Sequence, residues 1–180
     1  YTILKDTAGI GYALFCVGDS YAQLGQVKKG LDYLNRSLAI RIKLDDQNGI
    51  ALVKKALGRA YRQTKQYGLA IGNLNEALKI TQGLNDQYEQ LAIMLDLSDV
   101  YLDIPNYDKV KDYALRGIKI GKAIDSKSGV ADCYLRLVTV YKKKHDIPKA
   151  FAAQSEMLAI QDSLQGEKSL KDVTLMEINR

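Results

Sequence analysis

The residues that could carry catalytic or metal-binding chemistry are few in this sequence. His145 is its one histidine and stands in a predicted turn before Pro148, where a histidine is far more often solvated than catalytic. No Cys, His and Asp side chains have the spacing of metal ligands. No glycine-rich loop follows a predicted strand to cradle a phosphate, and no serine lies in a nucleophile signature. We therefore predict that the chain is not an enzyme and uses no metal or cofactor.

The positive charge of the chain raises nucleic-acid binding as an alternative. Its 26 lysines and arginines outnumber its 21 aspartates and glutamates, which gives a net charge of +5. The densest basic run, Lys142-Lys143-Lys144, falls at the C-terminal end of a predicted helix, where cations are stabilised by the helix dipole. No aromatic residues are interleaved with the basic ones as base stacking requires. We interpret these charges as a solvated surface and expect no nucleic-acid partner.

An internal repeat of 40 residues organises the chain and is clearest at Leu57-Gly58-Arg59-Ala60-Tyr61. Three columns recur: a large apolar residue, a small residue directly after it, and a tyrosine four positions after the first. The large column is Val17, Leu57, Leu97 and Leu137, the small column is Gly18, Gly58, Ser98 and Val138, and the tyrosines are Tyr21, Tyr61, Tyr101 and Tyr141. A spacing of four places the large residue and the tyrosine on one helical face. The small residue lets a second helix approach closely, and such helix pairs must stack to cover their apolar faces. Tyr61 is expected to be buried.

Residues that can cap a helix N-terminus recur at each expected helix start. The first-helix caps are Asp6, Asp46, Asp86 and Ser126, and the second-helix caps are Gln26, Gln66, Asn106 and Asp146. They predict first helices at 7–24, 47–64, 87–104 and 127–144, and second helices at 27–44, 67–84, 107–124 and 147–164. Residues 1–168 then form one array, with the tail of an upstream repeat at 1–8 and repeats at 9–48, 49–88, 89–128 and 129–168. Since Gly166 stands where a cap should be and the columns degrade to Glu177 and Ile178, residues 165–180 are expected to form a capping or linker helix.

The two cysteines, Cys16 and Cys133, fall on first helices three repeats apart. Several helix layers of roughly 8–10 Å each separate them, whereas a disulfide needs Cα atoms within about 7 Å. We therefore expect both to be unpaired, small apolar residues in or near the core. No apolar run approaches the ~20 residues that a membrane-spanning helix needs.

The Leu57-Gly58-x-x-Tyr61 core resembles the tetratricopeptide repeat family, in a variant with a 40-residue period and longer helices. The chain departs from the family pattern where an aromatic is usual, at Leu34, Leu74, Ala114 and Gln154, and it lacks the usual proline that closes the second helix. The resemblance covers about nine-tenths of the chain. It implies an all-α fold, namely a right-handed α-solenoid of antiparallel helix pairs.

The same resemblance implies a concave groove lined by first helices, in which a polypeptide binds. Carried over column by column, the ligand-binding candidates are Tyr12, Phe15, Asp19, Lys55, Arg59, Arg62, Asp96, Asp99 and Arg136. In one interpretation, Arg59 and Arg62 hold a ligand carboxylate. In the other, which is at least as well supported, Asp19, Arg59 and Asp99 occupy one column in consecutive repeats and pair with each other, which for exposed pairs contributes only ~0–1 kcal/mol.

A short stretch from Asp162 to Glu177 resembles the helix that follows the repeats of bacterial sensor histidine kinases and regulators of the Bacteroidetes type. We therefore expect a protein- or peptide-binding scaffold, the sensory or adaptor region of a larger signalling protein, of which this chain looks like a fragment without membrane contact. That resemblance implies a periplasmic location, and otherwise a cytoplasmic one. The alternative is a structural module that forms a homodimer through exposed array ends carrying Leu4 and Ile10.

Overall fold

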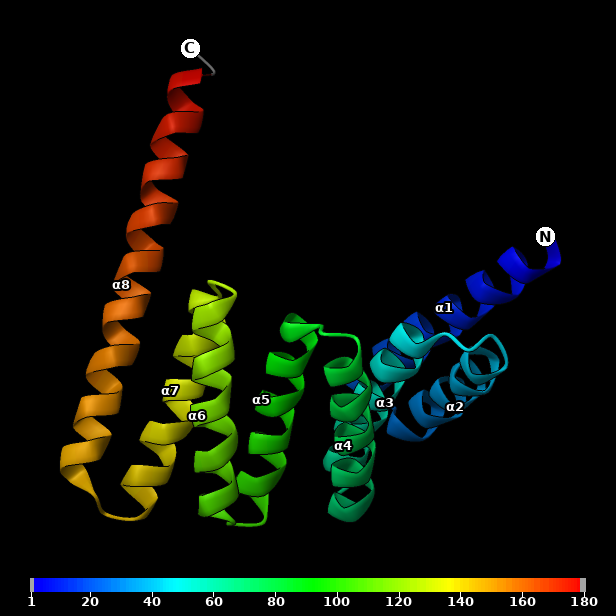
Figure 1. The fold of residues 1–180 in the computed structure, drawn as a ribbon, viewed down its shortest axis with the longest axis horizontal. Helices are drawn as coiled ribbons and strands as arrows, with labels where there is room; N and C mark the ends of the chain where they lie inside the picture. Colours follow the sequence, from blue (N-terminus) through cyan, green and yellow to red (C-terminus); the bar gives the residue numbers. More distant parts are fainter. Residues whose placement is uncertain (1, 179–180) are drawn as a thin grey trace. The chain divides into compact units, whose positions relative to one another are not determined.

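The computed structural model describes the backbone of residues 2–178 and the side chains of residues 7–168. The described backbone is helical throughout apart from short turns, and it forms eight helices (Figure 1). They are α1 (Thr2–Gln23), α2 (Val27–Lys43), α3 (Gln47–Gln63), α4 (Tyr67–Gly83), α5 (Gln87–Asp103), α6 (Tyr107–Ala123), α7 (Lys127–Lys143) and α8 (Ile147–Ile178). Helices pack in antiparallel pairs, namely α1 with α2, α3 with α4, and α7 with α8, so the predicted all-α solenoid of helix pairs is confirmed. No helix in the described chain is both long and apolar enough to cross a membrane.

The helices belong to two compact units, residues 1–100 and residues 101–180, which are described separately. In the first unit, α1 packs on α2, α3 on α4, and α2 on α3. In the second, α7 packs on both α6 and α8. Six of the predicted helices match the observed bounds to within one residue.

Two helix ends differ from the prediction. α1 begins at Thr2 and runs through Asp6 without a break, because no preceding helix packs on it in the described chain and no turn is required there. α8 continues through Gly166 to Ile178 as one helix, since a lone glycine within a helix costs only about 1 kcal/mol relative to alanine. The predicted tail of an upstream repeat stays a prediction. The side chains of Leu4, Glu177 and Ile178 lie outside the described residues.

The turns between helices share one left-handed residue at every twentieth position. Lys65 has φ 59°, and Asp45, Asn85, Asp125 and His145 have φ between 51° and 57°. After α3, the N–H of Gln66 donates to the carbonyl of Tyr61 at 2.9 Å, and that of Lys65 donates to the carbonyl of Arg62 at 2.9 Å. These are the two hydrogen bonds of a Schellman motif, a helix ending in which glycine is usual at the left-handed position.

We expect Lys65→Gly to stabilise the protein, because a left-handed conformation costs an L-residue roughly 1–2 kcal/mol and costs glycine almost nothing. Some of this gain is lost through the greater freedom of glycine in the unfolded chain, which leaves about 0.5–1 kcal/mol. Urea unfolding followed by circular dichroism measures it. Gly25 already has φ 79° at the equivalent turn, so Gly25→Lys is the reciprocal variant and should destabilise. Equal midpoints for wild type and Lys65→Gly would contradict the expectation.

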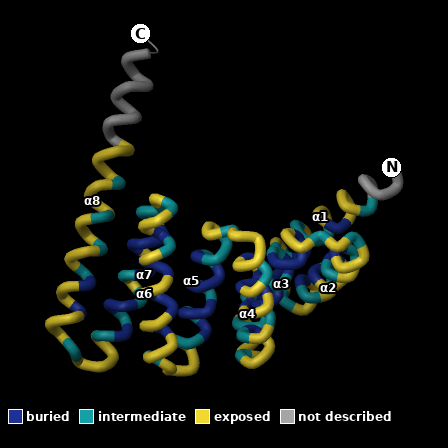
Figure 2. Tube along the Cα trace, in the orientation of Figure 1, coloured by how far each residue is buried: buried dark blue, intermediate teal, exposed yellow. Residues whose placement is uncertain are grey.

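The core of the first unit lies between the helix pairs (Figure 2). Its centre is a cluster of Ala22, Leu34, Val53, Ala56, Leu57 and Ala60. As predicted, the small column permits close approach, since a Cβ placed on Gly58 would lie 2.5 Å from Cγ of Leu74. Val17 departs from its column: it is 40% exposed while Leu57 is 2% exposed, because no helix in the described chain covers that side of α1.

The tyrosine column is half-buried rather than buried, which corrects the expectation for Tyr61. Tyr61 packs against the core cluster from its edge. In two repeats the column tyrosine stacks on a tyrosine of the second helix, Tyr21 on Tyr33 and Tyr101 on Tyr113. A half-buried ring of this kind contributes less than the roughly 3–5 kcal/mol of a fully buried aromatic.

The two cysteines are unpaired, as predicted. Cys133 is fully buried on α7, and burial raises the pKa of its thiol to about 12, whereas Cys16 on α1 is partly exposed. Because the thiolate is the reactive form, we expect iodoacetamide at neutral pH to modify Cys16 alone in the native protein and both residues in denaturant. Mass spectrometry counts the adducts, and Cys16→Ser should abolish native labelling. Native modification of Cys133 would contradict its burial.

Candidate polypeptide-binding face

The first helices of residues 1–100 carry most of the predicted binding residues. Lys55, Arg59 and Arg62 stand four and three residues apart on α3, so they share one helical face. The opposite face of α3 enters the core through Val53 and Leu57. α3 is thus divided into a packing face and a basic face by the helical period alone.

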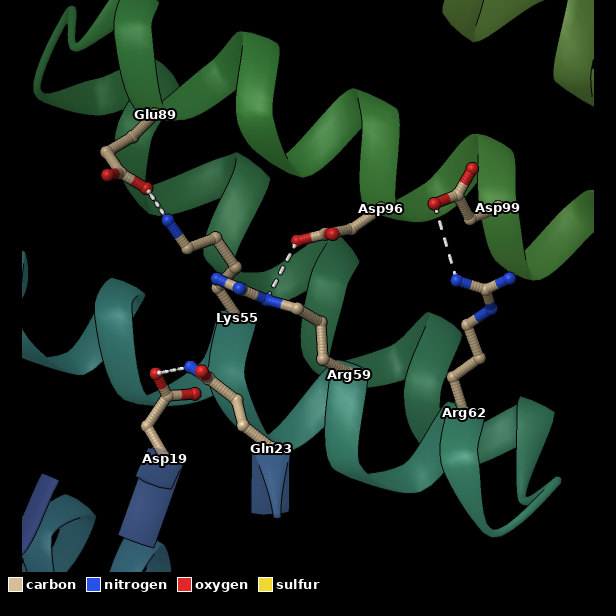
Figure 3. Close-up of polar contacts among 8 residues, drawn as sticks. All are labelled: Asp19, Gln23, Lys55, Arg59, Arg62, Glu89, Asp96 and Asp99. Atoms are coloured by element: carbon tan, nitrogen blue, oxygen red, sulfur yellow. Dashed lines mark hydrogen bonds and ion pairs between the residues drawn. The ribbon is translucent and has the colours of Figure 1, made fainter. Parts of the chain in front are cut away.

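The basic face of α3 meets acidic side chains of α5 (Figure 3). Lys55 Nζ lies 2.5 Å from Glu89 Oε2, Arg59 Nε lies 3.3 Å from Asp96 Oδ2, and Arg62 Nη1 lies 3.3 Å from Asp99 Oδ2. We call these six residues the charge seam. The three cations are therefore neutralised within the chain, as the pairing interpretation supposed.

The register of the pairing differs from the expected one. Arg59 pairs with Asp96 rather than Asp99, and Asp19 accepts a hydrogen bond from Gln23 at 2.7 Å instead of pairing with Arg59. Arg62 and Asp99 are 37 residues apart, not 40. The offset of three residues is close to one helical turn, so successive first helices are displaced by about a turn and same-column side chains do not meet.

The members of the charge seam differ in how much surface they offer. The Lys55 side chain is 11% exposed and that of Glu89 is 29% exposed, so this pair is mostly enclosed by protein. The Arg59 side chain is 43% exposed. Its Nε lies 3.3 Å from Asp96 Oδ2, an ion pair without the geometry of a hydrogen bond, and this Nε has no hydrogen-bond partner among the described residues. A guanidinium has five N–H donors, so both Nη groups of Arg59 can serve a ligand.

Of the two predicted apolar binding residues on α1, Tyr12 is exposed to solvent and Phe15 is partly buried. Tyr12 is 58% exposed on α1, with its ring centroid 6.3 Å from that of Phe15. A side-chain hydrogen bond with Cys16 raises the pKa of Tyr12. Phe15 instead packs against the core cluster, so the fold does use it, contrary to the expectation that packing does not need it.

The remaining candidate, Arg136, lies on α7 in the second unit, so it is not placed with the others. Its Nη1 donates to the carbonyl oxygen of Asp132, 3.0 Å away on the same helix. Among the described residues, no three His, Cys, Asp or Glu side chains gather as metal ligands do.

Two charged contacts were missed by the sequence reasoning. Glu89 was not among the predicted binding residues, but its carboxylate pairs with Lys55. A signal existed, since Glu89 replaces the glycine of Gly9, Gly49 and Gly129, and Lys55 replaces the apolar residue of its own column. Arg41, which is buried at the end of α2, pairs with the cap residue Asp46.

Comparison with known proteins agrees with a fold of repeated helix pairs. Residues 10–83 match the family model described as tetratricopeptide repeat. This stretch of the chain is therefore similar to tetratricopeptide repeats. A search of curated protein sequences found no significant match. The resemblance to sensor histidine kinases of the Bacteroidetes type is not confirmed and stays a prediction.

Several solved structures share the tetratricopeptide fold of this chain. Aspartyl phosphate phosphatase F from Bacillus subtilis superposes with a TM-score of 0.84 at 15% identity, covering 88% of this chain and 42% of that one. A Rap protein complexed with Competence and Sporulation Factor gives 0.79 at 15% identity, covering 94% and 46%. A signal transduction ATPase with a tetratricopeptide repeat sensor, from Pyrococcus horikoshii, gives 0.77 at 20% identity, covering 91% and 27%. The chain spans less than two thirds of the length of each, and at these identities the likeness shows the fold alone.

Proposed function

We propose that this chain is a polypeptide-binding scaffold whose ligand lies on the face formed by α1, α3 and the part of α5 before residue 101. The single observation that carries the proposal is the partly exposed guanidinium of Arg59. Its Nε lies 3.3 Å from Asp96 Oδ2 as an ion pair, while the side chain stays 43% exposed. A ligand carboxylate can bind both Nη groups in a bidentate manner without breaking the internal pair.

The rest of the face supports an extended or helical segment with an acidic and an apolar group. Tyr12 offers an exposed aromatic ring on α1, and aromatic and arginine side chains are the usual energetic centres of protein interfaces. The likeness to a Rap protein solved with Competence and Sporulation Factor is consistent with a binding role. The likeness to an ATPase with a tetratricopeptide repeat sensor is consistent with the sensory or adaptor region of a larger protein.

A phage-displayed peptide selection on the wild-type chain, followed by fluorescence anisotropy, tests this function. We expect selected peptides to contain an acidic residue, and Arg59→Glu to weaken their binding about 30-fold, which corresponds to the ~2 kcal/mol of a central contact. Arg36→Glu is the matched control, because Arg36 is an exposed arginine on α2 that pairs with Asp32 at 3.8 Å. It should leave binding unchanged.

Thermal unfolding of the same variants separates binding from stability. Arg59→Glu removes one partly exposed ion pair, so its melting temperature should fall only slightly. If Arg59→Glu lowers the melting temperature substantially while the selected peptides bind as before, Arg59 serves the charge seam alone and the proposed face is wrong.

Self-association through the uncovered side of α1 is the second candidate function. Ile10 is 54% exposed and Val17 is 40% exposed, whereas their column mates Ile50 and Leu57 are buried. An exposed copy of an internal packing face favours contact with another chain. Light scattering across a concentration series should then show a dimer that Ile10→Lys abolishes, and a monomer at all concentrations would exclude it.

A further inference from the structure

A second surface feature lies apart from the charge seam, at the turn from α1 to α2. It is an open pocket of 860 Å³, and the residues that line it include Tyr21, Tyr33, Lys28, Lys29 and Asp32. We call it the Tyr21–Tyr33 pocket. It shares no residue with the charge seam.

The pocket combines an aromatic wall with two uncompensated cations. The rings of Tyr21 and Tyr33 stack with centroids 5.6 Å apart and planes 15° apart, and Lys29 Nζ lies 5.5 Å from the Tyr21 centroid. Asp32 is matched by Arg36. Neither Lys28 nor Lys29 has a carboxylate within ion-pair distance among the described residues.

The third repeat contains a similar pair of stacked tyrosines, with ion-paired charged residues beside it. Tyr101 and Tyr113 stack at 5.9 Å and 15°, and Arg116 lies 5.3 Å from the Tyr113 centroid while pairing with Asp112 at 3.2 Å. However, Asp108 stands there at the position of Lys28, and it pairs with Lys144 at 2.7 Å.

The N-termini of α2 and α6, which lie beside these two tyrosine pairs, differ in their capping. Asn106 accepts the N–H of Lys109 at 3.2 Å at the start of α6, whereas the Gln26 side chain makes no capping hydrogen bond at the start of α2. In the third repeat the helix cap and Asp108 are thus satisfied internally. The first repeat presents Lys28 where the third presents the paired Asp108, whereas Lys29 and Lys109 are the same residue in both.

We propose that the Tyr21–Tyr33 pocket binds an acidic polypeptide segment, with a side-chain carboxylate between Lys28 and Lys29 and an adjacent apolar side chain on the Tyr21 ring. A carboxylate fits better than a phosphate dianion because Asp32 lines the same pocket and repels the second charge more strongly. The lysines also act as point charges, without the planar fork that favours phosphate. The volume exceeds that of a single anion and leaves space for the neighbouring apolar group.

An NMR titration of the isotope-labelled chain tests this binding. The probe is the acetylated and amidated peptide Glu-Glu-Leu-Glu-Glu, and its matched uncharged control is Gln-Gln-Leu-Gln-Gln. We expect the acidic peptide alone to shift the amide signals of Val27, Lys28 and Lys29 and the ring signals of Tyr21 and Tyr33. Lys28→Glu should weaken that binding at least about tenfold without unfolding α2, since an acidic residue in the first turn is favoured by the helix dipole.

Lys109→Glu in the third repeat is the matched control variant and should leave the shifts of Val27, Lys28 and Lys29 unchanged. Equal shifts with the glutamine peptide, or undiminished binding by Lys28→Glu, would overturn the proposal. So would saturation of the same signals by inorganic phosphate in the absence of any response to the acidic peptide. Loss of these shifts in Arg59→Glu but not in Lys28→Glu would assign the peptide to the charge seam and would equally overturn the pocket.

Discussion

Gly58→Val is expected to destabilise the protein by about 2–3 kcal/mol, as overpacking of a tight core does. A Cβ on Gly58 would lie 2.5 Å from Cγ and 2.8 Å from Cδ2 of Leu74, which is itself fully buried on α4. Valine is acceptable in this column when the partner column also changes, because the fourth repeat has Val138 and Gln154 at the positions of Gly58 and Leu74. The cost therefore comes from the pairing of Gly58 with Leu74. Urea unfolding gives the free energy difference.

A double-mutant cycle isolates that pairing. Leu74→Ala alone leaves a cavity and should cost roughly 2–5 kcal/mol. In the double variant the valine side chain enters part of the vacated space, so we expect Gly58→Val/Leu74→Ala to cost about 2 kcal/mol less than the sum of the two single costs. Gly72→Val is the matched control, since nothing lies within 4 Å of a Cβ at Gly72 on α4. Additive costs in the cycle would contradict the close contact between α3 and α4.

Glu89→Ala is expected to destabilise the first unit by about 3 kcal/mol, because it leaves the ammonium of Lys55 enclosed without a countercharge. Lys55 and Glu89 are the most enclosed pair of the charge seam, so solvent screens them less than an exposed pair. Thermal and urea unfolding measure the loss. Asp32→Ala is the control, since it removes an exposed pair with Arg36 and should cost less than about 1 kcal/mol.

Removing the unpaired charge of Lys55 should restore most of the stability that Glu89→Ala loses. Lys55→Met keeps the length of the side chain without its charge, so Lys55→Met/Glu89→Ala is expected to be about as stable as the wild type, as found when buried ion pairs are replaced by apolar residues. If the double variant were as unstable as Glu89→Ala, packing of the glutamate stem rather than its charge would account for the loss.

The proposed roles of Arg59 and of Lys28 can fail separately. Arg59 belongs to the charge seam between α3 and α5, and Lys28 belongs to the pocket at the α1–α2 turn. Since the two sites share no residue, a partner that uses both would lose affinity in each variant, and a partner that uses one would discriminate between them. The variants thus locate a ligand along the first unit before its identity is known.

The repeat, the helix bounds and the close contact at Gly58 were predictable from the sequence because each depends on spacing along one helix. An apolar residue and a tyrosine four positions apart must share a face, and a glycine beside them must mark close packing when it recurs. The cap residues were predictable only in part. Asp46 and Asp86 accept the N–H groups of Gly49 and Glu89, whereas the predicted caps Gln26, Gln66 and Ser126 make no side-chain capping hydrogen bond.

Contacts between helices were not predictable in the same way, because they depend on how far one helix is displaced along its neighbour. The column alignment placed Arg59 opposite Asp99, but a displacement of about one turn pairs Arg59 with Asp96 and Arg62 with Asp99. That displacement results from the packing of the whole core, so no single position encodes it. The sequence by itself therefore determined a stack of helix pairs with charged first helices. Only the tertiary structure decided which charges neutralise each other, that Phe15 belongs to the core, and that Arg59, Lys28 and Lys29 remain able to meet a ligand.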